Sequence, residues 1–404
     1  MRLSLTLLAA LASTAMASPA FAGSGDPIEI SEGMTLDPIL DLRLRVETAE
    51  QSSFEQAATS VTFRVRTGAT LSYEGFTLLA EGEGNVTLER SFNDTLPRNG
   101  VEPFPVIADP ETLELNRLHI GYQAENASIV LGRQRIIHDD ARFVGNVVWR
   151  QNEQTYDAVR LRVTQGPLMI DGTYAISQRT IFGSNSPRTE FEGDFLLSRA
   201  ALELGPVDLV AFHYALDYED RLNFSSETLG ASASLSIPVG PASFGARLRY
   251  ATQSDNGDNP LTYQADYWLA EGSLKLAGFT ARAQYEELGS DEGLAAFQTP
   301  LATAHKFNGF ADLFLVTPAS GLADTNFSLA RTITVPGLPG GISVKAIYHD
   351  FDSAIGRIDF GDEIDFVASF KINQLAFLVK YADYDANSFA VDTERLTIQL
   401  GLSF

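Results

Sequence analysis

Apolar and polar residues alternate with a period of two along most of the chain. In residues 62–72 one parity carries Phe63 and Leu71, while the other carries threonine, arginine, glycine and serine. The same alternation returns in residues 155–164 and 228–237. An amphipathic helix would repeat apolar residues every three to four positions. The pattern therefore predicts β-strands with one apolar face and one polar face.

Short and long connections alternate between the predicted strands. About eight short turns lie near residues 74–75, 125–126, 166–167, 205–206, 240–241, 278, 339–341 and 373–374. About nine longer polar loops lie roughly at residues 48–60, 90–112, 138–154, 179–192, 217–227, 252–263, 288–320, 352–361 and 385–393. Short periplasmic turns and long extracellular loops are typical of outer-membrane barrels. The counts predict an all-β fold, a transmembrane antiparallel up-and-down β-barrel of about 18 strands.

The two ends of the chain indicate the same location. Residues 1–22 combine an early arginine, an apolar stretch and the sequence Ala20-Phe21-Ala22, which is typical of a secretory signal peptide. The chain ends in an alternating segment whose last residue is Phe404, and such a strand is similar to the signal that the barrel-assembly machinery recognises. We expect a signal peptide at residues 1–22 and one barrel domain at residues 23–404 in the cell outer membrane, surrounded by lipid and lipopolysaccharide.

Composition narrows the functional classes. The 404 residues include no cysteine, which excludes disulfides, thiolate metal sites and a catalytic thiol. The formal charge of −23 argues against nucleic acid as a partner, because binding phosphates requires a basic surface. His138, followed by two aspartates, is the best candidate for a metal or acid–base site, but it lacks partners at suitable spacing. Residues 255–259 look calcium-like without the spaced glutamate of an EF-hand loop. We therefore predict no metal, no cofactor and no catalytic residue.

The polar parity, which would face the lumen, is rich in arginine. Arginines two positions apart lie on one face of a strand and would stack along the pore axis. The candidates are Arg43, Arg45, Arg64, Arg66, Arg160, Arg162, Arg199, Arg247, Arg249 and Arg282, with Arg117, Arg133 and Arg135 if their strands keep register. A surplus of guanidinium groups would attract anions, because guanidinium stays charged and binds carboxylates in a bidentate manner.

A structural interpretation competes with anion binding. The same arginines would only brace the barrel if lumenal carboxylates cancel their charge. The candidate partners are Asp41, Glu47, Glu81, Glu83, Asp171, Glu271 and Glu286.

Two segments resemble the outer-membrane alginate export family. One contains GRQRII at 132–137, RFVGN at 142–146, WRQN at 149–152 and QTYD at 154–157. The other, residues 299–324, reads TPLATAHKFNGFADLFLVTPASGLAD. The resemblance implies an 18-stranded barrel with a narrow pore for an anionic polysaccharide such as alginate.

The resemblance also assigns roles to residues. It implies that Arg133, Arg135, Arg142, Arg150 and Arg160 line the pore or its constriction. It implies a gating loop, carrying His305, Lys306 and Asn308, that folds near or into the mouth. A packed plug is the alternative role for that loop, because His305 and four nearby apolar residues could form a small cluster.

These observations predict a passive, cofactor-free channel for an anionic solute or polysaccharide. The concentration gradient or a periplasmic export partner would set the direction of transport. Three alternatives stay open: an anion-selective nutrient-uptake porin, a sealed structural barrel and a barrel-embedded hydrolase.

Overall fold

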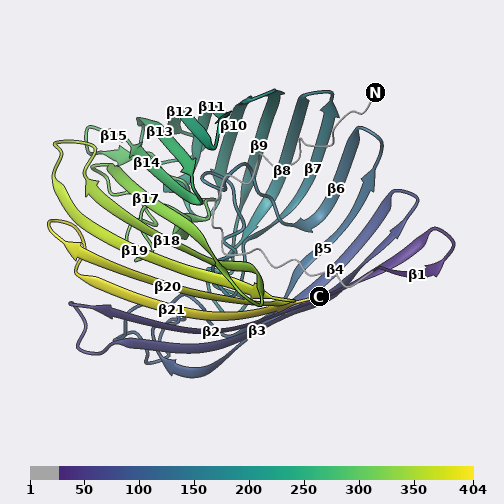
Figure 1. The fold of residues 1–404 in the computed structure, drawn as a ribbon, viewed down its shortest axis with the longest axis horizontal. Coiled ribbons are helices and arrows are strands. Elements are labelled where there is room, and N and C mark those ends of the chain that lie inside the picture. Colours follow the sequence, from purple (N-terminus) through teal and green to yellow (C-terminus); the bar gives the residue numbers. More distant parts are fainter. Residues whose placement is uncertain (1–26) are drawn as a thin grey trace.

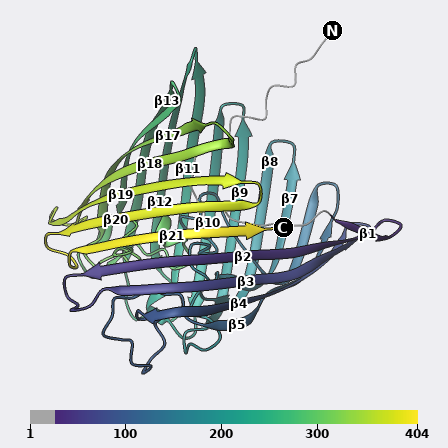
Figure 2. The same cartoon turned by 60° about the horizontal axis from the view of Figure 1, so that its bottom comes forward.

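The computed structural model describes residues 27–404, so the predicted signal peptide and the predicted mature start at Gly23 lie outside the described residues. Within this range, 18 antiparallel strands close into one barrel, and the short β1 adds a nineteenth strand to the same sheet. Figures 1 and 2 show the closed ring and the strong tilt of its strands. The predicted 18-stranded up-and-down barrel is confirmed.

The strands have the following bounds. The first half comprises β1 (Ile28–Ser31), β2 (Met34–Gln51), β3 (Ala58–Tyr73), β4 (Phe76–Ser91), β5 (Thr112–Gln123), β6 (Ala127–Gln134), β7 (Thr155–Gln165), β8 (Leu168–Arg179), β9 (Glu190–Leu204) and β10 (Val207–Tyr218). The second half comprises β11 (Ser226–Val239), β12 (Ala242–Asp255), β13 (Gln264–Leu276), β14 (Phe279–Leu288), β17 (Leu322–Val335), β18 (Leu338–Asp352), β19 (Asp359–Ile372), β20 (Leu375–Ala386) and β21 (Thr393–Ser403). Two strands of a loop ribbon, β15 (Ser290–Asp291) and β16 (Ala295–Ala296), and two short 3-10 helices, η1 (Leu222–Phe224) and η2 (Ala304–Lys306), complete the described elements.

The barrel closes where the first and last long strands meet. β2 and β21 pair from Asp41 opposite Ser403 to Gln51 opposite Thr393. The backbone N–H of Phe404 then donates to the carbonyl of Leu40 at 2.9 Å. Beyond that point β1 pairs with the start of β2, at the end of the barrel that Figure 2 shows on the right. The seam therefore leaves little unpaired backbone, as a strand edge in lipid requires.

Tight turns connect the strands at one end of the barrel and longer segments connect them at the other. The predicted positions agree with the strand bounds except at the turn between β17 and β18. We expected that turn at residues 339–341, but it consists of Pro336 and Gly337, and β18 already begins at Leu338. Pro followed by Gly suits a type II turn, whose third position needs a positive φ, and Gly337 has a φ of +82°.

The two strand faces differ as the alternation predicts. Large apolar residues such as Leu131, Leu248 and Phe327 are exposed on the outer face, while charged residues are buried on the inner face. Aromatic residues such as Tyr122 and Tyr174 are also exposed on the outer face. No helix in the described range is long and apolar enough to cross a membrane.

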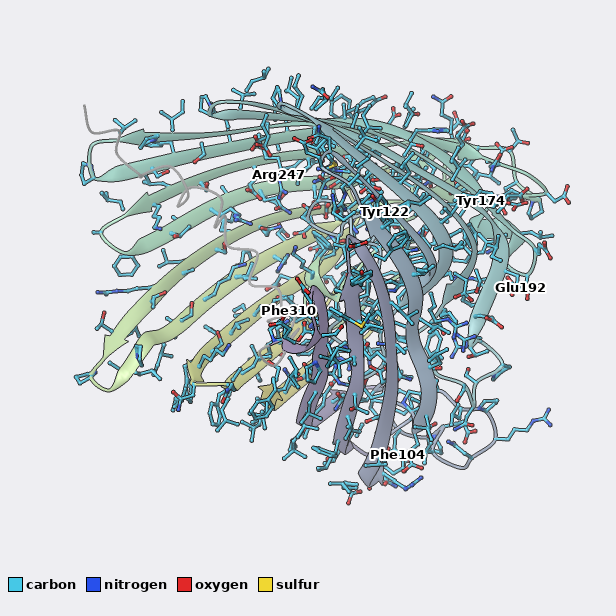
Figure 3. The ribbon with its side chains drawn as sticks, turned by 90° about the vertical axis from the view of Figure 1, so that its right-hand side faces the viewer. Phe104, Tyr122, Tyr174, Glu192, Arg247 and Phe310 are labelled. Carbon is cyan, nitrogen blue, oxygen red and sulfur yellow. The ribbon has the colours of Figure 1, made fainter. Side chains whose placement is uncertain are left out.

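Two long connections fold into the barrel instead of away from it. The segment 135–154 follows β6, and the segment 289–321 follows β14. They meet where Val144 forms an isolated bridge with Leu301 and the N–H of Gly145 donates to the carbonyl of Leu301 at 2.8 Å. Their aromatic residues pack with wall residues in one buried cluster, and Phe310 lies inside the ring of strands in Figure 3. We call these segments the 135–154 loop and the 289–321 loop, and together the plug.

Candidate functional site

Burial separates the lumenal arginines into two groups. The side chains of Arg43, Arg45, Arg64 and Arg66, on β2 and β3, are at most 2% exposed. The 135–154 loop covers them, and Arg45 donates to the carbonyl oxygen of Trp149. These arginines are therefore shielded from any solute that moves through the lumen.

Carboxylates neutralise this first group. Arg45, for example, lies 3.2 Å from Asp109, and Arg150 lies 2.6 Å from Asp312. In the described residues, three of these four arginines and four arginines around them are ion-paired with seven carboxylates: Arg45, Arg64, Arg66, Arg117, Arg135, Arg150 and Arg395 with Asp41, Glu47, Glu81, Glu83, Asp109, Glu153 and Asp312. We call these seven arginines and Arg43 the sealed group, and its ion pairs brace the barrel.

The second group lies across the barrel, on β7, β9, β12 and β14. Its members are Arg160, Arg162, Arg199, Arg247, Arg249 and Arg282, which we call the arginine wall. These six arginines share only four carboxylates, namely Asp139, Asp140, Asp171 and Glu271. Five of the six side chains keep 12–45% of their surface exposed, and Arg249 is buried. Figure 3 labels Arg247 of this wall.

The 135–154 loop supplies part of the wall's negative charge. Asp140 lies 2.6 Å from Arg247 and 3.1 Å from Arg249, and Lys306 donates to the backbone carbonyl of Asp140 at 2.7 Å. Burial alone would raise the pKa of Asp140, but Arg249 and Arg247 hold it well below its usual range. Asp140 therefore stays charged and fixes the loop against the wall.

Two of the predicted gating residues, Asn308 and Lys306, connect the 289–321 loop to the 135–154 loop and to barrel strand β14. Asn308 donates to Glu286 at 2.8 Å, and its side-chain oxygen accepts a hydrogen bond from Arg142 at 3.0 Å. Arg142 also forms an ion pair with Glu286 at 2.7 Å. These contacts, like that of Lys306 with the Asp140 carbonyl, show a packed plug rather than a freely solvated loop.

One predicted pore residue points away from the lumen. Arg133 shares its strand face with Leu131 and is paired with Leu118, and both leucines are exposed on the outer face. Its guanidinium binds Asp157 at 2.8 Å. The predicted inward orientation of Arg133 is corrected, because the parity of β6 places it outside. Arg135 does face inward, where it joins the sealed group through Glu153 at 2.5 Å.

Sequence reasoning missed several charged residues of the interior. Lys380 and Arg395 lie on inward faces and contact the plug. Arg117, a conditional candidate of the sequence analysis, does face inward, where it pairs with Glu81. Asp109 and Asp312 come from loops and supply counter-charges. The parity rule that revealed the other arginines would have found Lys380 and Arg395, whereas nothing in the sequence marks the loop aspartates. All seven predicted bracing carboxylates form ion pairs with arginine.

The structure places His138, the best sequence candidate for a metal or acid–base site, in a buried contact with a tyrosine. His138 contacts the hydroxyl of Tyr214 at 3.1 Å, and Asp171 lies 4.0 Å away, engaged by Arg160. Burial lowers the pKa of His138 to about 4. Among residues 27–404, no three His, Asp or Glu side chains are arranged to hold a metal ion. In the calcium-like segment, the Asp255 carboxylate accepts the N–H of Tyr263 at 3.0 Å.

A family comparison decides the class of the protein. Residues 4–328 match the family described as Gram-negative porin. The chain belongs to this family. This porin is therefore a passive outer-membrane channel for small solutes, and its family consists of channels rather than enzymes. The outer-membrane location predicted from the sequence is confirmed, and the turn end of the barrel is the periplasmic end.

Solved structures share the fold. Pseudomonas aeruginosa OccK9 (OpdG) is similar with a TM-score of 0.72 and 15% identity, over 91% of this chain and 98% of that chain. P. aeruginosa OpdK, solved with vanillate, gives 0.72 and 14% over the same shares. A BenF-like porin from Pseudomonas fluorescens Pf-5 gives 0.70 and 12%, over 91% and 99%. A search of curated proteins found no match.

The predicted membership of the alginate export family is wrong. The family match is to Gram-negative porins, and the similar solved structures are OccK, OpdK and BenF-like porins. The motifs that suggested alginate export lie mainly in the two loops of the plug, at 132–157 and 299–324. In this porin the residues of these motifs pack the plug: Trp149 and Phe310 are buried, and Arg142 and Asn308 join the two loops. The motifs therefore have a structural role that requires no polymer substrate.

Proposed function

We propose that this porin admits small anionic solutes, chiefly organic carboxylates, along the arginine wall. The observation that carries the proposal is the shortage of counter-charge: six arginines share four carboxylates, and five of the six keep solvent-exposed surface. The sealed group contributes less to selectivity, because seven carboxylates pair with seven of its eight arginines and the eighth, Arg43, is buried against the 135–154 loop.

The geometry of the wall suits transfer between weak sites. Arg160 and Arg162 both bind Asp171, so neither guanidinium has a carboxylate of its own. A solute carboxylate can accept the remaining N–H donors in a bidentate manner. Conduction requires binding strong enough for entry and weak enough for exit, and guanidiniums already shared with a wall carboxylate meet both conditions.

Uptake of small nutrients fits this site better than export of a polymer. OpdK, which has the same fold, was solved with vanillate, a small aromatic carboxylate. That likeness supports carboxylates as a chemical class and does not identify the solute of this porin. The solute would move down its own gradient, because a passive channel supplies no energy.

Proteoliposome uptake of matched aromatic solutes tests the proposal. Benzoate and benzylammonium are similar in size and opposite in charge, and benzamide is the neutral control. We expect benzoate to enter faster than benzamide, and benzamide faster than benzylammonium. Equal rates for the three solutes, or fastest entry of benzylammonium, would contradict the proposal.

A further inference from the structure

Trp149 joins the two loops of the plug to the part of the barrel where β2 and β20 flank β21. The ring of His305, from the 289–321 loop, stacks on Trp149 with centroids 4.1 Å apart and planes 3° apart. The guanidinium of Arg45 on β2 lies 4.2 Å from the Trp149 ring centroid, and the ammonium of Lys380 on β20 lies 4.1 Å from it. Trp149 is 3% exposed. The His305–Trp149 stack is therefore one of the contacts that join the 289–321 loop to the 135–154 loop, and it lies beside β2 and β20.

The two nitrogens of His305 have different partners. Nδ1 lies 2.7 Å from Oδ1 of Asp312, and Nε2 lies 3.0 Å from Nζ of Lys380. In its ammonium form Lys380 offers only donors, and Nε2 of His305 then accepts with its lone pair. Asp312 is a carboxylate that already binds Arg150, so it accepts the hydrogen on Nδ1. These partners assign His305 as the neutral imidazole with its hydrogen on Nδ1.

We propose that the His305–Lys380 contact is an acid-sensitive lock on the plug, and that protonation of His305 at Nε2 releases the 289–321 loop from Trp149 and opens the channel. A proton at Nε2 would place two cationic donors face to face across 3.0 Å with no acceptor between them. The imidazolium keeps its bond to Asp312, which lies on the same loop, but it can no longer accept from Lys380. His305 and Asp312 would then move together, away from β20.

Charged groups on every neighbouring element influence the lock. Arg150 of the 135–154 loop and Lys380 oppose the protonation of His305, and Asp312 favours it. Around Lys380 lie Arg45 on β2, Lys345 on β18, Asp365 on β19 and Asp312. Arg395 on β21 acts on Asp312. The cations around the lock are therefore Arg45, Arg150 and Lys345, and its anionic neighbours are Asp312 and Asp365.

The direction of the pH effect follows from the two states of His305. In the locked state burial lowers the pKa of His305 to about 4, against the opposing effect of Asp312 and with help from Lys380. Once released into water, the ring would titrate near its usual pKa of about 6.5. The released state therefore binds more protons, and the lock weakens as the pH falls from about 6.5 to about 4, by up to about 300-fold in its equilibrium constant.

Conductance and tryptophan emission of the full-length protein test the lock together. Bilayer conductance is recorded as the pH falls from about 7 to about 4, the range set by the His305 titration. Emission is recorded in a Trp268→Phe background, where Trp149 is the one remaining tryptophan among the two of the chain. We expect conductance to rise and Trp149 emission to shift to longer wavelength, both reversibly. His305→Gln should abolish both changes, because the amide can accept from Lys380 but does not titrate.

Two further variants keep the test decisive. Lys380→Met removes the ammonium that protonated His305 would face, so it should also abolish the acid response even if His305→Gln folds poorly. His213→Gln is the matched control, because His213 lies on the outer face beside Glu227, and it should keep the full response. An acid response that persists in both His305→Gln and Lys380→Met would overturn the proposal, as would a wild-type channel without any response in this range.

Discussion

Arg43 on β2 holds the backbone of Arg150 in the 135–154 loop, with Nη1 3.1 Å from the carbonyl oxygen of Arg150. The same nitrogen lies 3.1 Å from the carbonyl oxygen of Val148. Among the described residues Arg43 has no carboxylate within ion-pair distance, so the loop backbone supplies its acceptors. A barrel arginine that looks like a pore residue in the sequence is therefore an anchor for the plug.

Removal of this anchor should loosen the loop without unfolding the barrel. In Arg43→Met the carbonyls of Val148 and Arg150 lose charge-assisted hydrogen bonds, which contribute about 1.5–3 kcal/mol each when one partner is charged. Hydrogen–deuterium exchange should become faster at residues 147–151. Arg282→Met is the control, because Arg282 pairs with Glu271 on the neighbouring strand, and it should leave exchange at 147–151 unchanged. Equal exchange in both variants would show that Arg43 does not anchor the loop.

Substitution of Arg160 and Arg162 should change the ion selectivity of the channel, whereas substitution of Arg133 should not. Arg160 and Arg162 face the lumen with partly exposed side chains, whereas Arg133 is on the outer face. The double variant Arg160→Gln/Arg162→Gln should lower the ratio of anion to cation permeability, measured from reversal potentials. Arg133→Gln should leave that ratio unchanged. If Arg133→Gln has the larger effect, the assignment of the wall is wrong.

Shortening the 289–321 loop should widen the channel. Deletion of residues 301–318 removes His305, Asn308 and Phe310, whose side chains contact the barrel strands β14 and β20. The loop contributes no barrel strand, so β14 and β17 should still pair as they do now. We expect higher single-channel conductance together with the heat-modifiable mobility of a folded barrel on gels. A folded variant with unchanged conductance would mean that the loop does not restrict the pore.

The last residue should be required for assembly. Phe404 continues β21 past Ser403, and its N–H closes the seam by donating to Leu40 at 2.9 Å. An unpaired backbone group in lipid costs several kcal/mol, so an incomplete seam is unfavourable. Deletion of Phe404 should lower the amount of porin in the outer membrane and leave unassembled chain in the periplasm, whereas Phe404→Tyr should assemble normally. Fractionation and immunoblotting measure both, and an unchanged membrane yield after the deletion would argue against this role.

The sequence contains most of the fold because each strand face meets a different solvent. Lipid on one side and polar lumen on the other impose a period of two, so the 18 strands could be counted from alternation and turns. The turn after β17 was misplaced because Pro336-Gly337 and Pro339–Gly341 lie close together and both suit a turn. Arg133 was misplaced because Val130, between Ile129 and Leu131, hides the parity of β6.

The functional site could be predicted only in part. Period two places arginines on the inner face, but it cannot tell which of them a loop will cover. Arg43 and Arg247 have equivalent sequence patterns, yet one lies beneath the 135–154 loop and the other is partly exposed. That difference comes from contacts between distant segments, such as Val144 with Leu301. Local sequence does not encode such contacts in a readable pattern.

The reversal potential of the wild-type porin in a KCl gradient tests the central claim most directly. The account predicts that the channel prefers chloride at low salt, although the chain carries a net charge of −23, because the arginine wall faces the path of the ions. The preference should weaken as screening shortens from about 10 Å at 0.1 M to about 3 Å at 1 M salt. A channel that prefers potassium at low salt would contradict the account.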